Sequence, residues 1–171
     1  MKTGKTIGFD ADDTLWENEV FFHKAQLKFK KLHPHIKDPD EEIFQIEKKN
    51  IKLYGYGIKG FILSLIEASA KYSSNQTNIE NITEILNIGK EMLTHQLELL
   101  PGVEDTLKYL SGQFKLIMIT KGDLFDQQRK IQGSGLSKYF SSIEIVSEKD
   151  EKAYLDILAK HGILPKNFIM V

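Results

Sequence analysis

The chain has 171 residues, a formal net charge of −1, and ordinary shares of hydrophobic residues (41%) and charged residues (27%). The near-neutral charge gives no reason to expect binding to nucleic acid or to an anionic membrane surface, and the absence of cysteine excludes disulfides and thiolate chemistry. Because no segment resembles a signal peptide and no apolar run is long enough to span a bilayer, we expect a cytoplasmic protein.

The first predicted element is a buried strand over residues 6–10, where a short apolar run ends in carboxylates. Asp10, Asp12 and Asp13 lie within four positions at its carboxyl end. Crowding three acids is unfavourable unless a cation takes part, so the pattern predicts a site for a hard divalent metal.

Residues 17–100 carry helical periodicity and almost no strand signal. Asp38 followed by Pro39 is typical of a helix start, with a capping acid and proline in the first turn. A polar stretch at 73–76 predicts a loop. The first helix is expected at 17–32 and the fourth at about 82–99. The second is expected to start near residues 38–39 and to carry apolar residues as far as Leu53, and the third to have an apolar face that includes Phe61 and Ala68.

After Pro101 and Gly102 the pattern alternates between short helices and apolar, β-branched runs. The predicted strands are 114–119, 143–146 and 168–171, and the predicted helices are 103–110, 123–133 and 152–161. Such alternation favours a parallel sheet with right-handed crossovers, which the first strand must join. We therefore predict an α/β fold, with a doubly wound, Rossmann-like core of residues 1–16 and 101–171 and a helical cap of residues 17–100.

The chemistry of the first strand end can be stated from the residues alone. One carboxylate, Asp10, can attack phosphorus while a second, Asp12, moves a proton to and from the leaving oxygen. A Mg²⁺ ion that bridges the nucleophile and the phosphate would remove the repulsion between them, and Thr14 offers a hydroxyl and an N–H.

An acidic strand end of this kind has three other common interpretations. A solvated acidic turn and an Asp-x-Asp metal site for a nucleotide-sugar both remain open. A calcium loop of the EF-hand kind is set aside, because the positions that need glycine and a bidentate acid hold Leu15 and Phe21.

Two later strand ends carry similar signals. The apolar run ends in Thr120, Lys121 and Gly122, which offer a hydroxyl and N–H groups to a phosphate. The simpler interpretation is an ordinary strand-to-helix connection in which Asp123 caps the helix. Lys149 lies in a charge run after the next strand, where a solvated loop is the alternative. Because the carboxyl ends of parallel strands meet at one edge of a sheet, these groups would converge on one crevice.

Together these three places resemble the haloacid dehalogenase-like (HAD) hydrolase superfamily. Its first motif, an apolar strand followed by Asp-x-Asp-x-Thr-Leu, is matched by residues 9–15. The resemblance implies that Asp10 is the nucleophile and Asp12 the general acid/base, whose backbone carbonyl also reaches Mg²⁺.

The second motif of the family is matched at Thr120, with Lys121 in place of the usual Asn. The third motif is a lysine, for which Lys149 fits best because Tyr154 follows at the usual distance; Lys152 is the rival. The stretch 100–103 is similar to the family's return from cap to core, and the insertion point is that of its first cap type.

The resemblance also implies an activity. Dehalogenases of the superfamily lack an acid at the position of Asp12, so the resemblance favours phosphoryl transfer to or from a small phosphorylated metabolite, by a phosphatase or a phosphomutase. The family's fourth motif, which supplies another Mg²⁺ ligand, has no counterpart before Val171. We therefore expect a fragment of a longer protein, with a catalytically silent or binding-only member as the alternative.

The other residues that could form a ligand or substrate site give no clear pattern. We interpret the histidines as surface or loop residues because they lack ligand spacing, and we expect Trp16 to pack near the cap junction. The histidines are His23, His33, His35, His95 and His161.

Overall fold

The computed structural model describes residues 4–72 and 78–171. The first half of the chain contains β1 (Thr6–Phe9), α1 (Glu19–Leu32), α2 (Pro39–Tyr54), α3 (Ile58–Tyr72) and α4 (Ile79–Thr94). The second half contains α5 (Val103–Ser111), β2 (Lys115–Lys121), α6 (Leu124–Ser134), β3 (Ser142–Val146), α7 (Glu151–Lys160) and β4 (Phe168–Met170), with short 3₁₀ turns at Leu136–Tyr139 and Pro165–Asn167. The polar loop predicted at 73–76 lies outside the described residues.

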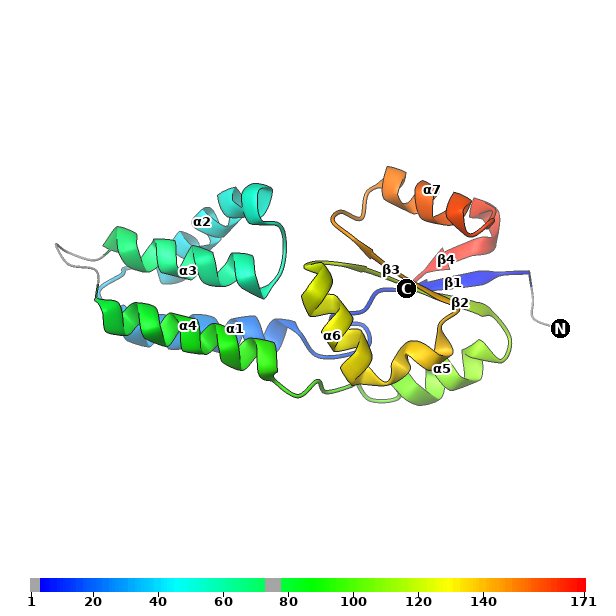
Figure 1. Ribbon diagram of the computed structural model, residues 1–171, viewed down its shortest axis with the longest axis horizontal. Coiled ribbons are helices and arrows are strands. Elements are labelled where there is room, and N and C mark those ends of the chain that lie inside the picture. Colours follow the sequence, from blue (N-terminus) through cyan, green and yellow to red (C-terminus); the bar gives the residue numbers. More distant parts are fainter. Residues whose placement is uncertain (1–3, 73–77) are drawn as a thin grey trace. The chain divides into compact units, whose positions relative to one another are not determined.

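The strands form one parallel sheet in the order β3-β2-β1-β4 (Figure 1). The register pairs Phe9 with Met118 and Thr120 with Ile145, so the carboxyl ends of β1, β2 and β3 lie at the same edge. The predicted α/β class, with a parallel sheet and a helical insertion after the first strand, is confirmed.

Helices cover both faces of this sheet, with α5 and α6 on one face and α7 on the other (Figure 1). Alternate residues of β2 serve the two layers: Leu116 and Met118 pack with α5 and α6, whereas Ile117 and Ile119 pack with Ile157 of α7. Because both faces are buried, the strand reads as a continuous apolar run.

The contacts within the chain divide it into two compact units. The α/β unit runs to Asn18 and resumes at Gln96, and the helical unit spans Glu19–His95. The sequence put these junctions at residues 16–17 and 100–101.

The helical unit has its own apolar core, which is formed by all four of its helices. The helix start predicted at Asp38 is confirmed, because its carboxylate accepts a hydrogen bond from the N–H of Glu41 at 3.2 Å and Pro39 opens α2. Glycines admit close helix packing, since a Cβ on Gly89 of α4 would lie 2.8 Å from Ile62 of α3.

The helix predicted at 82–99 is wrong at both ends. It begins at Ile79 behind the N-cap Asn78, and it ends at Thr94 because His95 adopts an extended backbone. Leu97 and Leu99 fit the helical spacing, but they pack in the core of the α/β unit instead.

The histidines were predicted to lie on the surface or in loops, and His33 does lie in the loop directly after α1, but it is buried there. It is 1% exposed, and its ring lies 4.6 Å from that of Phe29. Apolar packing, rather than a ligand, accounts for its burial.

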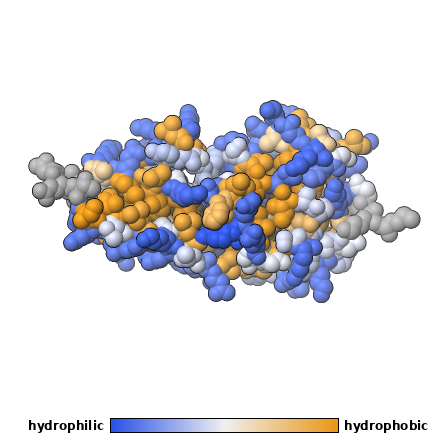
Figure 2. All heavy atoms as spheres, in the orientation of Figure 1, coloured by the Kyte–Doolittle hydropathy of each residue, from blue (hydrophilic) through white to orange (hydrophobic). Residues whose placement is uncertain are grey.

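None of the described helices combines the length and the apolar character needed to cross a membrane. On the face drawn in Figure 2, apolar side chains are visible on both units among charged ones. Leu53 of the helical unit and Phe125 of the α/β unit are examples of large apolar side chains that are exposed.

Candidate active site

Asp10 stands at the tip of the central strand β1. Its N–H donates to the carbonyl of Val171 at 2.9 Å, which extends the pairing of β1 with β4. Its carboxylate accepts the N–H of Ala11 at 2.7 Å and forms an ion pair with the ammonium of Lys149. The side chain is 38% exposed, so the carboxylate is anchored by the strand and still accessible from solution.

Lys149 reaches Asp10 from the connection between β3 and α7. Its side chain is 16% exposed, and the ion pair joins the end of one strand to the crossover that follows another. Burial, together with the charge of Asp10, raises the pKa of Tyr154, which therefore stays a neutral phenol beside the site. Lys152, the rival for the role of Lys149, lies in the first turn of α7 and lines an open surface cavity.

The carboxylate of Asp12 is held by three donors from outside the acidic cluster. The indole N–H of Trp16 donates to Oδ1 at 2.6 Å, and the side-chain amide of Gln127 donates to Oδ2 at 2.8 Å. The ammonium of Lys130 contacts both oxygens, at 2.9 and 3.1 Å. Charge-assisted hydrogen bonds are among the strongest in proteins, so the orientation of Asp12 is strongly defined.

Lys130 lies among further polar partners on α6. It donates to Oδ1 of Asn18 at 2.8 Å, and its ammonium lies 3.9 Å from the carboxylate of Asp126. Burial raises the pKa of Asp126, against the opposing effect of the Lys130 and Arg129 charges. The ammonium thus stands between two carboxylates in a largely buried position.

Thr120, near the end of β2, and Gly122, directly after β2, belong to the same edge of the sheet. The hydroxyl of Thr120 is buried without a hydrogen-bond partner among the described residues, and an unpaired buried hydroxyl is costly. The hydroxyl is enclosed by its neighbours, so a phosphate would reach it only after they move. Gly122 has a φ of 149° and lies against the amide of Gln127, where a Cβ would come within 2.9 Å.

The other predicted phosphate ligands make different contacts. The ammonium of Lys121 lies 3.6 Å from the carboxylate of Glu148, and its backbone carbonyl accepts the amide of Gln127 at 3.2 Å. The N–H of Thr14 donates to the carbonyl of Ala11 at 3.2 Å and so helps to close the turn after β1.

Asp13, the third acid of the cluster, bonds to a different part of the chain from Asp10 and Asp12. It is exposed, adopts a left-handed backbone with a φ of 57°, and accepts the N–H of Asn18 at 2.9 Å. Asp and Asn tolerate this conformation better than most residues, which explains an acid at this turn position.

Sequence reasoning missed the groups that hold Asp12. Gln127 and Lys130 are three residues apart and therefore share one face of α6, but this spacing does not reveal what that face meets. Trp16 was expected to pack, and its ring is fully buried, yet its N–H also holds the proposed proton carrier.

The donors at this edge suit a magnesium ion. Mg²⁺ is usually bound by one or two protein oxygens together with water and substrate phosphate, so a cage of many side chains is not needed. Within the described residues, no group of three His, Cys, Asp or Glu side chains gathers as a metal site. The accessible carboxylate of Asp10 and the backbone carbonyl of Asp12 are oxygen donors of the right hardness, whereas the carboxylate of Asp12 is occupied by the three donors described above.

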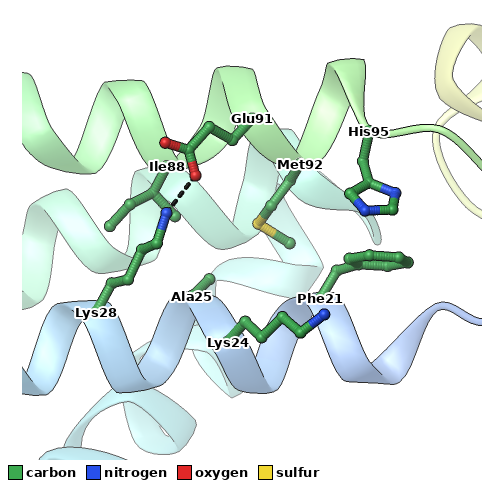
Figure 3. A pocket seen from close by; sticks show the side chains of 8 residues that line it. All are labelled: Phe21, Lys24, Ala25, Lys28, Ile88, Glu91, Met92 and His95. Atoms are coloured by element: carbon green, nitrogen blue, oxygen red, sulfur yellow. Dashed lines mark hydrogen bonds and ion pairs between the residues drawn. The ribbon is translucent and has the colours of Figure 1, made fainter.

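The helical unit contains a separate small cavity between α1 and α4 (Figure 3). Lys28 and Glu91 form an ion pair at one end, and the rings of Phe21 and His95 lie at the other with centroids 4.1 Å apart and planes tilted by 48°. Its volume of about 110 Å³ is well below the roughly 300–1,000 Å³ of typical ligand pockets. The edge of the sheet therefore remains the better candidate site.

A family model described as haloacid dehalogenase-like hydrolase matches residues 5–171. Among solved structures, a haloacid dehalogenase-like family hydrolase from Xanthomonas campestris is 36% identical, with a TM-score of 0.92. That match covers 97% of this chain and 71% of the other. The comparison with curated proteins gives no match.

Two more distant structures show the same fold. The HAD-hydrolase YfnB from Bacillus subtilis, solved with bound magnesium, is 17% identical with a TM-score of 0.60 over 97% of this chain and 76% of that chain. A predicted phosphoglycolate phosphatase from Haemophilus somnus is also 17% identical, with a TM-score of 0.59 over 98% of this chain and 76% of that chain.

Proposed function

Because the chain belongs to the haloacid dehalogenase-like hydrolases, we propose that it is a Mg²⁺-dependent phosphatase that forms an aspartyl-phosphate on Asp10. The observation that carries this proposal is the ion pair between Asp10 at the tip of β1 and Lys149 from the next crossover. A carboxylate at a strand end, paired with a cation that can also bind phosphate, suits the capture of a phosphoryl group.

In the first step, a carboxylate oxygen of Asp10 attacks the phosphorus of a small phosphomonoester in line with the leaving group. The bond from phosphorus to the ester oxygen breaks, and that oxygen takes a proton from Asp12. Lys149 stabilises the charge on the transferring group, because its ammonium already lies against the attacking carboxylate.

In the second step, Asp12 takes a proton from water, and the resulting hydroxide attacks the phosphorus of the aspartyl-phosphate. The bond from phosphorus to Asp10 breaks, which releases inorganic phosphate and restores the carboxylate. Asp12 thus ends each cycle with the proton that it needs for the next, as microscopic reversibility requires.

Magnesium would be held by Asp10 and by the backbone carbonyl of Asp12, where it supplies charge that offsets the repulsion between carboxylate and phosphate. Magnesium bound in the Bacillus subtilis relative supports this cofactor. The buried hydroxyl of Thr120 has no hydrogen-bond partner among the described residues, and a phosphate oxygen would supply one once the groups that enclose the hydroxyl move.

The test is the turnover of 4-nitrophenyl phosphate with Mg²⁺ by the unchanged chain, Asp10→Asn and Asp13→Asn. Asp10→Asn should lose turnover by about 10³-fold or more, because an amide cannot form the aspartyl-phosphate. Asp13→Asn is the matched control: Asn tolerates the left-handed backbone and can still accept the N–H of Asn18, so its turnover should stay within about twofold.

Equal turnover by Asp10→Asn and the unchanged chain would overturn the proposal. A titration with Mg²⁺ and BeF₃⁻, which mimics a phosphoryl group on the carboxylate, provides a second measurement. Failure of the unchanged chain both to turn over the ester and to bind BeF₃⁻ would favour a catalytically silent member instead.

A further inference from the structure

The grouping of Trp16, Gln127 and Lys130 around Asp12 is more than general packing. Each donates a hydrogen bond to its carboxylate, and each is buried or nearly so: Trp16 is fully buried, Gln127 is 3% exposed and the side chain of Lys130 is 12% exposed. Below, these three side chains are called the Asp12 clamp.

Lys130 is the charged member of the clamp, and its side chain is only 12% exposed. Its ammonium contacts both oxygens of Asp12, donates to Asn18 and lies near Asp126. Placing an ammonium in a largely buried position costs free energy unless opposite charges surround it, and here two carboxylates do so. Surface lysines that merely pair with acids do not show this enclosure.

We propose that Lys130 is a positioning residue for the proton transfers of Asp12, a step that rests on the proposed phosphatase function. Its ammonium contacts both carboxylate oxygens and so fixes the orientation of the group. When one oxygen carries the proton, it gives up one of its hydrogen bonds, and the remaining donors keep the carboxyl group directed at the leaving oxygen. Lys130 itself exchanges no proton with substrate; it acts through Asp12, with Trp16 and Gln127 setting the remaining angles.

The leaving group provides a test that a purely structural role would not satisfy. Phenyl phosphate leaves as a much more basic oxygen than 4-nitrophenyl phosphate, so its hydrolysis depends more on the proton from Asp12. Lys130→Met should therefore lower kcat for phenyl phosphate by about 10- to 100-fold, the usual cost of losing a supporting residue, and lower kcat for the nitro ester much less. KM should change by less than about threefold for both, because Lys130 does not touch substrate.

A double-mutant cycle with Asp12→Asn tests whether Lys130 acts through Asp12. If it does, Lys130→Met should have little further effect once Asp12 is Asn. Lys130→Arg should restore part of the rate by keeping the charge, and Lys130→Gln, which keeps an N–H donor, serves if the Met variant does not fold. Lys138→Met is the matched control, because Lys138 pairs with Glu104 on the surface and is 60% exposed.

A spectroscopic signal gives a readout besides activity. Trp16 is the only tryptophan of the chain, so its indole N–H gives a single resonance that reports its bond to Asp12. This resonance should move in Lys130→Met and in Asp12→Asn but not in Lys138→Met. An unmoved resonance in Lys130→Met, or an equal loss of kcat for both esters, would overturn the inference.

The same series separates this inference from the proposed function. If Asp10→Asn abolishes turnover while Lys130→Met leaves the ratio of the two esters unchanged, the phosphatase stands and the role of Lys130 falls. If Asp10→Asn turns over both esters normally, the phosphatase itself falls, and the positioning role falls with it.

Discussion

Replacing Gly122 by alanine tests whether the turn after β2 is built to hold Gln127 against Asp12. The backbone of Gly122 has a φ of 149°, a region that is essentially restricted to glycine, and the added strain should cost about 1–3 kcal/mol. The new Cβ would also lie 2.9 Å from Nε2 and 3.3 Å from Cγ of Gln127, so this side chain must move.

The displaced amide bonds to Oδ2 of Asp12 at 2.8 Å and to the carbonyl of Lys121 at 3.2 Å. Losing the bond to the charged acceptor costs about 1.5–3 kcal/mol, although the two effects will not add fully because they share one side chain. We expect Gly122→Ala to lower the free energy of unfolding of the α/β unit by about 2–5 kcal/mol in total.

The measurement is urea unfolding followed by tryptophan fluorescence. Trp16 belongs to the α/β unit and is the only tryptophan, so the signal reports that unit rather than the helical one. Two glycines without neighbours within 4 Å serve as controls. Gly102→Ala, at a φ of 77°, should show the backbone strain alone, about 1–2 kcal/mol, and Gly133→Ala within α6 should stabilise by about 0.5–1 kcal/mol. Equal losses for Gly122→Ala and Gly102→Ala would refute the role given to Gln127.

Two further predictions concern charge. Burial lowers the pKa of His33, with the charge of His35 as a smaller cause, so the unfolded chain binds the proton more readily. The stability that His33 contributes to the helical unit should therefore be fully present above its unfolded pKa of about 6.5 and be lost as the pH falls through the lowered pKa of the folded state. Urea unfolding followed by circular dichroism should show that His33→Leu removes much of this dependence while His23→Gln, at an exposed position, leaves it unchanged; the reverse order would contradict the assignment. Lys149→Met should lower kcat for 4-nitrophenyl phosphate by about 10²–10³-fold, because Lys149 pairs with Asp10. Lys152→Met should lower it by less than about threefold, because Lys152 lines an open surface cavity instead. Similar losses for both variants would contradict the assignment of Lys149 as the lysine of the third motif.

Local signals were sufficient for most of the sheet and its helices. The continuous apolar run at Leu116–Ile119 predicted a strand because both of its faces are buried, and Asp38 with Pro39 predicted a helix start because capping depends on only a few neighbouring residues. The resemblance of the first motif then pointed to the edge of the sheet that bears Asp10.

The failures have a different origin, since they depend on contacts between distant residues. Leu97 and Leu99 continue a helical spacing, and only the core that they join determines that the chain is extended there. Lys130 lies 118 residues from Asp12 in the sequence, so nothing local to either residue could have paired them. Burial of His33 is likewise a property of the assembled helices rather than of its neighbours in the sequence.

The strand order explains how three acids within four positions can each have a different partner. β1 lies between β2 and β4, at the point where the strand order switches: α5 and α6 lie on one face of the sheet, and α7, which connects β3 to β4, lies on the other. Asp10 receives its cation from the crossover after β3, Asp12 from α6, and Asp13 turns toward solvent.

This separate pairing also bears on the alternative of an Asp-x-Asp metal site for a nucleotide-sugar. Such a site needs both carboxylates to be free for one cation, whereas the oxygens of Asp12 already accept bonds from Trp16, Gln127 and Lys130. Two carboxylates in different surroundings can act as nucleophile and proton carrier, because each environment sets its own charge and direction. The contacts of Asp12 therefore argue against a second metal-binding carboxylate at this position.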